Sequence, residues 1–496
     1  MLVHKFMMKA GANIVGSALS FVSLMVMTRY VGEQYGVMMW AWAFTAMFNA
    51  FSDLGFNAAS MRYISRDGAD QSACFSTFLA VKLVMSFVVM AMSAISVAIS
   101  AMSGTMDTES VAVCVVFIVY YLMYNIQTAL TVTFDGRLES GKSSMALAIE
   151  YGVRSVMLII LALLQVDAST LSTAYFIGIL FSFAASLYMM RNTGLHVVRP
   201  RFIREYARFA APLAFSIMAI ALIEYLDKVM IGIYQGSLEV GFYTAAFGVV
   251  TAFTTLGTSL NNVLLPHLSK NRESHHESVE KTLWMSEKYI SILIMPLLVF
   301  LMVLGRPIAI VLFGDGYADS GDILSIQSVH IYVFILTGLM AQVLYSVDRA
   351  KVYMKASIVF AAVSLIGFFT LIPDRFLGIP MADLGSIGAA TSLALAYTVF
   401  AMVLVVCVRR DVGYRLCPGL WKVFASGAAG GLFLVAMQVL WGPEGLFQLA
   451  IVGIISEGVF LAAMLALKGI DRSDIDFIKS AFSRKGIQES ISEEWR

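Results

Sequence analysis

The sequence predicts an all-α integral membrane protein with about fourteen transmembrane helices. Of its 496 residues, 59 % are hydrophobic and 14 % are charged, whereas a soluble domain carries about 25 % charged residues. Apolar runs of spanning length recur along the chain, and lysines and arginines concentrate in every second connection between them. Lipid is therefore the expected surrounding of most of the protein surface.

Fourteen apolar runs approach the roughly 20 residues that a helix needs to cross a bilayer. Their approximate bounds are 10–29, 37–58, 74–101, 111–133, 145–165, 171–190, 209–234, 240–265, 288–312, 322–345, 356–372, 386–407, 420–440 and 445–467. The first run follows Lys5 and Lys9, as in a signal peptide, but it continues without a small-residue cleavage site. We therefore expect a retained span and an even number of crossings.

The basic residues indicate which side of the membrane the termini occupy. Connections on the N-terminal side hold 28 of the 34 lysines and arginines. These connections are 1–9, 60–73, 134–144, 191–208, 266–288, 346–355, 408–422 and the tail from 468. Because cytoplasmic loops collect lysine and arginine, both termini are predicted to be cytoplasmic, in an inner or plasma membrane. The six remaining basic residues are Arg29, Arg306 and Arg375 on the other side and Lys82, Arg154 and Lys228 within spans.

The two halves of the chain resemble one another. Residues 30–36 after the first span match 234–243 after the seventh, and residues 134–142 match 347–351. Both pairs are six spans apart, which predicts parallel repeats with a binding site between the halves. The predicted units are an N-lobe at 1–200, a C-lobe at 201–415, two further spans at 416–470 and a cytoplasmic tail at 471–496.

Three charged residues lie deep in the seventh span. A charge at this depth costs about 3 kcal/mol or more unless it faces a partner or water. Glu224 and Lys228 are four residues apart and are expected to pair on one helix face, whereas the adjacent Asp227 and Lys228 are not. Asp227 is therefore predicted to be the surplus charge and to face a wet central cavity.

Polar stripes on two spans point to the same cavity. The eighth span carries Thr244, Thr251, Thr255, Thr258 and Asn262 at helical spacing. The first span, which corresponds to the seventh by the repeat, carries Asn13, Ser17, Ser20 and Thr28. Both stripes are expected to border the cleft between the halves. The alternative is hydrogen bonding between helices, which serine and threonine commonly supply in membranes.

Other charged residues lie within spans, among them Glu457 in the fourteenth. Glu150 and Arg154 are four residues apart, which favours a structural ion pair. Asp53 comes late in the second span, and Lys82 comes early in the third, where it could extend to the cytoplasmic interface.

The sequence contains no signature of catalysis or of a cofactor. We find no Walker A sequence and no HExxH, CxxC or GxSxG motif, so no ATP hydrolysis and no cofactor are predicted. The four cysteines have no paired ligand spacing, and His275 and His276 are expected to be solvated loop residues rather than metal ligands. No connection is large enough for an extramembrane catalytic domain. A non-enzymatic protein without a nucleic-acid partner is expected.

Short motifs spread over residues 5–470 resemble one family. They are residues 28–36, 53–56, Arg62, Pro212, 227–232, 239–243, Pro266, Gly314 and 388–391. In order and spacing they resemble the polysaccharide-transporter branch, which includes Wzx-type flippases, of the multidrug/oligosaccharidyl-lipid/polysaccharide exporter superfamily. The segment 373–388 is longer than is usual in that family.

This resemblance implies two six-helix lobes in a V, with a cationic cavity between them and two extra helices. It implies transport of an isoprenoid-linked (di)phosphate oligosaccharide from the cytoplasmic to the outer leaflet by alternating access. The implied partners are that lipid-linked substrate and membrane lipid, with glycan-assembly enzymes as further candidates. The predicted substrate-binding residues are Asn13, Arg29, Lys82, Arg154, Thr251, Thr255 and Asn262, and the predicted ion-coupling residues are Asp53, Glu224 and Asp227.

Two other functions stay open at the level of the sequence. One is a cation-coupled drug antiporter of the same superfamily, for which Asp53, Glu224 and Asp227 would be the coupling carboxylates. The other is a membrane glycosyl-polymerase or ligase, which the short outer loops disfavour.

Overall fold

The computed structural model describes residues 2–66, 68–191, 193–270, 276–346, 349–413 and 417–470. Nearly all of them are helical, because a backbone in lipid must satisfy its hydrogen bonds within the same segment. Each of the fourteen expected spans overlaps a helix of 18 residues or more among these residues. Eleven of these helices are long and apolar enough, by length and composition, to cross a membrane.

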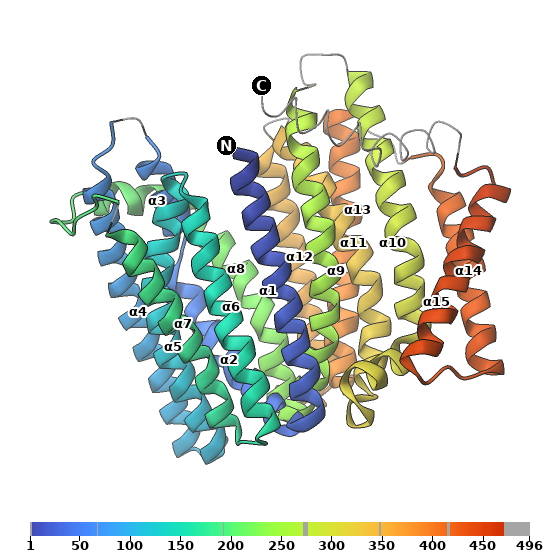
Figure 1. Ribbon diagram of the computed structural model, residues 1–496, viewed down its shortest axis with the longest axis horizontal. Coiled ribbons are helices and arrows are strands. Elements are labelled where there is room, and N and C mark those ends of the chain that lie inside the picture. The colour runs from blue at the N-terminus through green and yellow to red at the C-terminus, as the bar shows by residue number, and fades with distance from the viewer. Residues whose placement is uncertain are drawn as a thin grey trace.

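The helices form two bundles that lie side by side, with a helix pair at one edge (Figure 1). The first bundle contains α1 (Leu2–Tyr30), α2 (Gly32–Asn49), α3 (Phe56–Ile64), α4 (Gln71–Met102), α5 (Thr108–Gly136), α6 (Ser140–Leu163) and α7 (Ala168–Met190). The second contains α8 (Ile203–Gln235), α9 (Ser237–Lys270), α10 (His276–Phe313), α11 (Ser320–Ser346), α12 (Ala350–Leu371) and α13 (Gly385–Val412). The pair α14 (Leu420–Leu440) and α15 (Leu446–Ala466) packs on α10.

Helix α8 belongs to both bundles. Near its beginning, Tyr206 and Ala210 pack into an apolar cluster with Phe56 and Phe78 of the first bundle. Its last turns contact α9 of the second bundle. The division of the chain at residue 200 therefore stays a prediction, since the first turns of α8 pack with the N-lobe.

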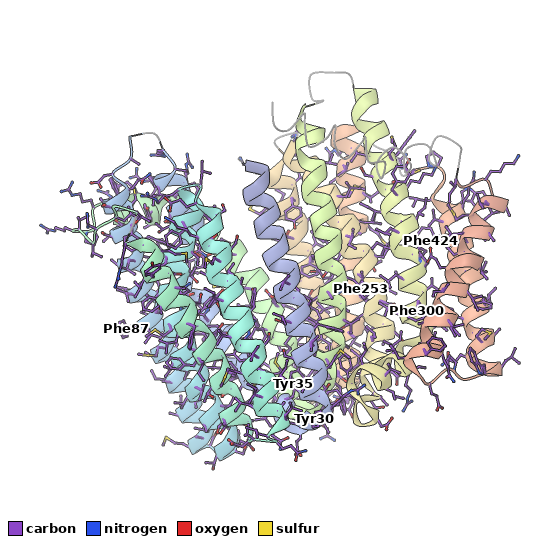
Figure 2. All side chains as sticks on the ribbon, in the orientation of Figure 1. Tyr30, Tyr35, Phe87, Phe253, Phe300 and Phe424 are labelled. Atoms are coloured by element: carbon purple, nitrogen blue, oxygen red, sulfur yellow. The ribbon has the colours of Figure 1, made fainter. Side chains whose placement is uncertain are left out.

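The bundles bury part of their apolar side chains and turn others outward. Phe87 and Phe424 are about half exposed and lie near opposite edges of the molecule (Figure 2). Tyr30 and Tyr35 lie at the end where the two bundles meet (Figure 2). Outward-facing apolar side chains of this kind are expected where lipid is the solvent.

The second expected span, 37–58, is not one helix. Helix α2 ends at Asn49, a short 3-10 turn η1 (Ala50–Ser52) follows, and Leu54 and Gly55 have φ of 45° and 92° before α3 begins. The Asp53 carboxylate accepts a hydrogen bond of 2.8 Å from the backbone N–H of Asn57 in the first turn of α3. Asp53 therefore lies at a break between helices, where it satisfies a free N–H of the new helix.

The unusually long segment 373–388 contains a short β-hairpin. Strands β1 (Arg375–Phe376) and β2 (Ile379–Pro380) pair antiparallel around Leu377 and Gly378. Both turn residues have positive φ, 52° and 83°, as a two-residue hairpin turn with the twist of a β-ribbon requires. The insertion thus forms a compact structure of its own and leaves α12 and α13 packed together.

The start of α7 offers a first prediction. Asp167 precedes the helix and accepts hydrogen bonds from the Ser169 hydroxyl and from the hydroxyl and N–H of Thr170, the latter two at 2.7 and 3.2 Å. These hydrogen bonds lower the pKa of Asp167 from an ordinary 3.8 to about 2, and the bond from Ser169 has the largest effect. A depressed folded-state pKa contributes stability above pH about 4 that is lost as the pH falls towards 2.

We expect Asp167→Ala to lower stability at pH 7 by about 0.5–1 kcal/mol, the usual loss for a helix cap. Thermal unfolding of the detergent-solubilised protein measures it. The difference between variant and wild type should shrink between pH 4 and pH 2, and a difference that persists at pH 2 would contradict this role.

Candidate substrate cavity between the lobes

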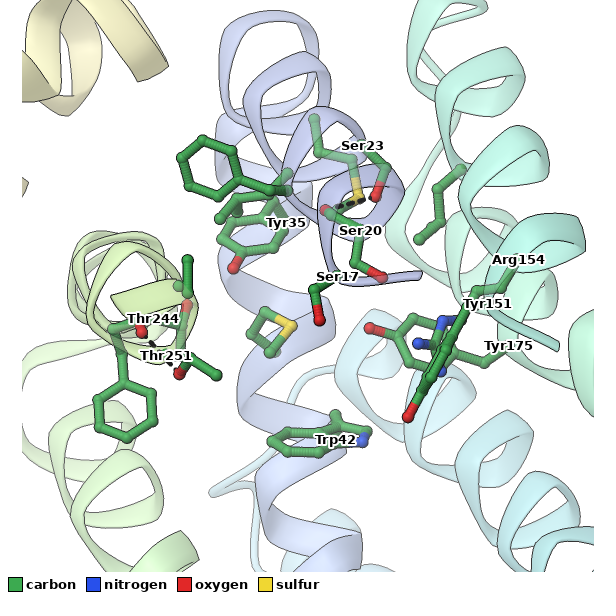
Figure 3. Close-up of a pocket in the computed structure, with 18 of the residues that line it drawn as sticks. Ser17, Ser20, Ser23, Tyr35, Trp42, Tyr151, Arg154, Tyr175, Thr244 and Thr251 are labelled. Atoms are coloured by element: carbon green, nitrogen blue, oxygen red, sulfur yellow. Dashed lines mark hydrogen bonds between the residues drawn. The ribbon is translucent and has the colours of Figure 1, made fainter. Parts of the chain in front are cut away.

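A cavity of about 590 Å³ lies between the two bundles. Helices α1, α2, α6, α7, α8 and α9 contribute its walls (Figure 3). The lining combines hydroxyl groups with aromatic rings. It includes Ser17, Ser20, Ser23, Tyr35, Trp42, Tyr151, Arg154, Tyr175, Glu224, Tyr225, Lys228, Thr244, Phe247 and Thr251. A central cavity between the halves, as the sequence predicted, is confirmed.

The two predicted polar stripes both contribute to the wall of the cavity. Ser17 and Ser20 come from α1, and Thr244 and Thr251 come from α9 (Figure 3). Both threonine hydroxyls donate to carbonyls of their own helix, at 2.7 Å for Thr244 and 2.9 Å for Thr251. The side chains of Asn13, Thr255 and Asn262 lie outside the described residues, so their predicted role stays a prediction.

Arg154 is held from several directions where α6 faces the cavity. Its guanidinium forms an ion pair with Glu150 at 3.3 Å, which confirms the predicted pair. The same group lies over the rings of Tyr151 and Tyr175, 4.9 and 4.8 Å from their centroids (Figure 3). The side chain is 14 % exposed and still lines the cavity. Its orientation is therefore set by the protein before any ligand arrives.

The prediction for the three charges of α8 is wrong. Lys228 pairs with the adjacent Asp227, at 3.1 Å, and also donates to the Glu224 backbone carbonyl at 2.7 Å. Tyr243 of α9 donates to the other Asp227 oxygen at 2.7 Å. Asp227 is only 1 % exposed, whereas Glu224 is an exposed side chain that lines the cavity. Among the described residues, no ion pair joins the Glu224 carboxylate to Lys228.

The physical reason is the flexibility of the lysine side chain. Its four-carbon stem folds back along α8, so that the ammonium reaches both the carbonyl one turn earlier and the carboxylate beside it. The Tyr243 hydroxyl turns that carboxylate towards α9 and away from the cavity. Glu224, and not Asp227, is thus the surplus charge.

The described lining does not have the net positive charge that the family resemblance implies. Its two cations, Arg154 and Lys228, are each paired with a carboxylate. Glu224 remains, and it gives this part of the cavity an excess negative charge. A phosphate group here would meet cations whose charge is already balanced.

Lys82 and Asp53 lie together inside the N-lobe, away from the cavity lining. The Lys82 ammonium is 3.9 Å from the Asp53 carboxylate and 3.4 Å from the Ser52 carbonyl oxygen. Asn125 accepts from the Ser52 hydroxyl at 2.9 Å and donates to Asn49 at 2.8 Å. Lys82 is 1 % exposed, so it does not extend to the membrane interface as the sequence had allowed. This contact joins residues of different helices, so spacing along the chain could not predict it.

Arg29 lies where the two bundles meet. Its guanidinium donates to the backbone carbonyls of Val311 and of Leu312, the latter at 3.2 Å, at the end of α10. Nearby, Tyr317 of the 3-10 turn η3 (Asp315–Tyr317) donates to the Gly32 carbonyl at 2.6 Å. These bonds join α1 and the start of α2 to the second bundle. Arg29 lines a separate cavity of about 310 Å³ with Glu33 and Asp315.

The aromatic lining was not predicted from the sequence. Its rings come from α1, α2, α6, α7, α8 and α9, and no motif marks them. The one usable signal was Tyr151, which is three residues before Arg154 and so shares its helix face. Among the described residues, no group of three histidine, cysteine or acidic side chains could hold a metal ion. His275 and the side chain of His276 lie outside those residues.

A cavity with a polar lining, between two bundles of apolar helices long enough to cross a membrane, is the arrangement typical of membrane transporters. A family model described as "Polysaccharide biosynthesis protein" matches residues 2–272, more than half of the chain. The chain therefore belongs to this family, and the resemblance seen in the sequence is confirmed. No curated protein sequence matches the chain.

Several solved structures share the fold. The lipid II flippase MurJ in an inward closed conformation has a TM-score of 0.71 at 12 % identity, over 93 % of this chain and 99 % of that one. An inward-facing multidrug resistance MATE family transporter of the MOP superfamily has a TM-score of 0.61 at 12 % identity, over 80 % and 94 %. The MATE multidrug transporter DinF-BH has 0.56 at 14 % identity, over 83 % and 95 %. At these identities the likeness is one of fold.

Proposed function

We propose that this protein flips an isoprenoid-linked (di)phosphate oligosaccharide from the cytoplasmic to the outer leaflet by alternating access. The observation that supports this most is the cavity between the lobes, lined by hydroxyl groups and aromatic rings, in a member of a polysaccharide biosynthesis family. Aromatic faces and hydroxyls suit a sugar, which presents both C–H faces and O–H groups.

The physical task fits this arrangement. A glycan with a phosphate cannot cross hydrocarbon unaided, whereas its isoprenoid tail can remain in the lipid throughout. The protein then needs only a wet slot for the headgroup. A membrane potential supplies about 2.3 kcal/mol per charge per 100 mV for an anion that leaves a negative-inside cell. Transport could thus proceed without an ATP site.

The proposed binding residues fall into three groups. Arg154 and Thr251 line the cavity and would contact the headgroup in this conformation. Asn13, Thr255 and Asn262 stay in the proposal on the polar stripes of the sequence alone. Arg29 and Lys82 contact protein groups instead, so they would take part only after the lobes rearrange.

The proposed coupling carboxylates differ in their surroundings. Asp53 lies beside Lys82, and Asp227 is paired with Lys228. Glu224 has no such cation among the described residues and faces the cavity. It is therefore the carboxylate best placed to exchange a proton or cation with the cavity water.

Arg154 variants test the proposed function. We expect Arg154→Ala to reduce glycan export at least tenfold, because it removes the one guanidinium of the described lining, while Arg154→Lys should retain part of it. A leaflet-specific assay of lipid-linked glycan in a deletion strain measures export, alongside the protein level in the membrane.

Arg306→Ala is the matched control, since Arg306 is exposed and pairs with the exposed Asp319. Wild-type export by Arg154→Ala at equal protein level would remove this residue from the site. A deletion strain in which lipid-linked glycan keeps its normal leaflet distribution would count against glycan flipping itself.

A cation-coupled drug antiporter is the second candidate, and Glu224 favours it. A carboxylate among aromatic rings, with no cation paired to it in the described lining, is the chemistry that binds an organic cation. If this function holds, expression should raise resistance to cationic drugs, and Glu224→Gln should abolish that resistance. Glycan export without any drug resistance would exclude it.

The proposed orientation has its own prediction. Reporter fusions at Ser103, Gln235 and Glu444 should lie outside the cell, and fusions at Arg201 and His275 should lie in the cytoplasm. The expectation rests on the uneven distribution of lysine and arginine. Paired alkaline-phosphatase and fluorescent-protein fusions measure it. A cytoplasmic signal at Gln235 would contradict the two-lobe topology.

A further inference from the structure

Helix α11 places two polar side chains in the apolar interior of the C-lobe. Gln327 and His330 are one turn apart and are 0 % and 4 % exposed. Within the described part of the chain, neither amide atom of Gln327 and neither ring nitrogen of His330 has a hydrogen-bond partner. Four buried polar atoms without partners are costly, which suggests a role other than stability.

Aromatic rings enclose the His330 side chain. Tyr397 of α13 stacks on the imidazole with centroids 4.3 Å apart and an interplanar angle of 27°. The ring centroid of Phe247 of α9 lies 6.3 Å from that of the imidazole, also with an interplanar angle of 27°. Phe334 meets the imidazole edge-on, with a centroid distance of 5.8 Å. Ring faces carry partial negative charge and attract cations. The enclosure would therefore stabilise a protonated imidazole better than an aliphatic core would.

The remaining groups around His330 connect it to the charges of α8. Gln327 lies near the Tyr243 hydroxyl, which donates its proton to the Asp227 carboxylate and not to the Gln327 amide. The Lys228 ammonium lies 4.9 Å over the ring of Phe247, which also stacks on His330. The other titratable groups on the neighbouring elements are Glu224 on α8, Tyr353 on α12 near Tyr397, and Glu287 on α10 near Tyr332.

A proton fits this site better than a metal ion does. Asp227 already has the Lys228 ammonium as its counter-ion at 3.1 Å. An alkali or alkaline-earth cation needs several oxygen ligands, and the Gln327 carbonyl oxygen alone is unpartnered here. A proton needs one imidazole lone pair, and histidine changes its charge near neutral pH.

We propose that His330 is a proton-binding site of the C-lobe, which links proton movement to the change between conformations. The proposal rests on the transport function proposed above. The imidazole takes a proton from water on one side of the membrane and returns it to water on the other, so the protein is unchanged over a cycle. In the present conformation no carboxylate of the described residues contacts the imidazole, which is therefore neutral, and this is the state after proton release.

The first experiment observes the proton directly and requires no substrate. The full-length protein, labelled with ¹⁵N in its histidine rings, is reconstituted in nanodiscs and titrated by NMR. His330 is assigned as the signal missing from His330→Gln. Because burial disfavours the charged imidazole in this conformation, we expect the His330 signal to be neutral at pH 8 and to move towards imidazolium only as the pH falls to 4. A signal that stays neutral down to pH 4, in protein that remains folded, would overturn the proposal.

The second experiment measures export in cells at external pH 6 and pH 8. His330→Phe keeps the aromatic packing and removes the lone pair, so we expect a folded protein with at least a tenfold loss of export and no remaining pH dependence. Tyr332→Phe is the matched control on the same helix, where the hydroxyl pairs with Ser291 at 3.0 Å, and it should export within twofold of wild type.

The two experiments separate this proposal from the proposed function. Wild-type export by His330→Phe, at equal protein level, would reject the proton site and leave glycan flipping standing. An absence of glycan export by the wild-type protein, together with a titrating His330 signal, would reject glycan flipping and keep the proton site.

Discussion

Substituting Lys228 with methionine is expected to lower the free energy of unfolding by about 3–5 kcal/mol, the usual destabilisation when one partner of a buried ion pair is removed. Lys228 and Asp227 have side chains that are 5 % and 1 % exposed, at 3.1 Å from one another. Without the ammonium, the Asp227 carboxylate would keep only the Tyr243 hydroxyl and the backbone N–H of residue 228 among its described contacts. A charge so deep in the protein has no access to water that could compensate.

The double variant Asp227→Asn with Lys228→Met should recover most of this loss. An asparagine oxygen can still accept from Tyr243, and no uncompensated charge remains. Lys142→Met is the control, because its pair with Glu139 is about 30 % exposed and contributes about 0–1 kcal/mol. Thermal unfolding of the four proteins in detergent measures the effect. Equal losses for Lys228→Met and Lys142→Met would contradict a buried, structural pair.

Enlarging Gly36 is expected to open the contact between the lobes. A Cβ atom at this position would lie 2.3 Å from the Ser237 carbonyl oxygen and 2.9 Å from its carbonyl carbon. Both are backbone atoms and cannot move aside like a side chain. Overpacking costs about 1–3 kcal/mol, and each 1.4 kcal/mol is a tenfold change in a conformational equilibrium. Gly36→Ala should therefore shift the population towards a conformation with separated α2 and α9.

Cysteine labelling measures this shift. A cysteine replaces Val240 in a protein from which the native cysteines have been removed. Val240 is fully buried, and the next residue, Gly241, lies in close contact with Gly36. Membrane-impermeant maleimide should label it about tenfold faster in Gly36→Ala than in wild type. Gly152→Ala is the control, since its added Cβ would meet nothing within 4 Å. An unchanged labelling rate in Gly36→Ala would show that a methyl group at this position does not separate α2 from α9, and would contradict the prediction.

The sequence alone determined where the helices are and which ends of them collect positive charge. Lipid imposes a length, an apolar surface and internal hydrogen bonding on every span, and these constraints are readable residue by residue. The Glu150–Arg154 pair was predictable for the same reason, because its four-residue spacing lies on one helix face. The polar stripes of α1 and α9 likewise indicated the cavity that both helices line, although Asp227, the charge expected to face it, does not.

Only the tertiary structure decided how the buried charges are partnered. Asp227 is turned by Tyr243, which lies on the following helix, and Lys82 meets Asp53 across a break between helices. Arg29 bonds to carbonyls 282 and 283 residues away, and the aromatic cavity lining comes from six helices. Spacing along one helix limits which side chains share a face. The partner of a flexible side chain, however, depends on which groups the neighbouring helices place within its reach. That information lies in the packing of the bundle, and no single span of the sequence contains it.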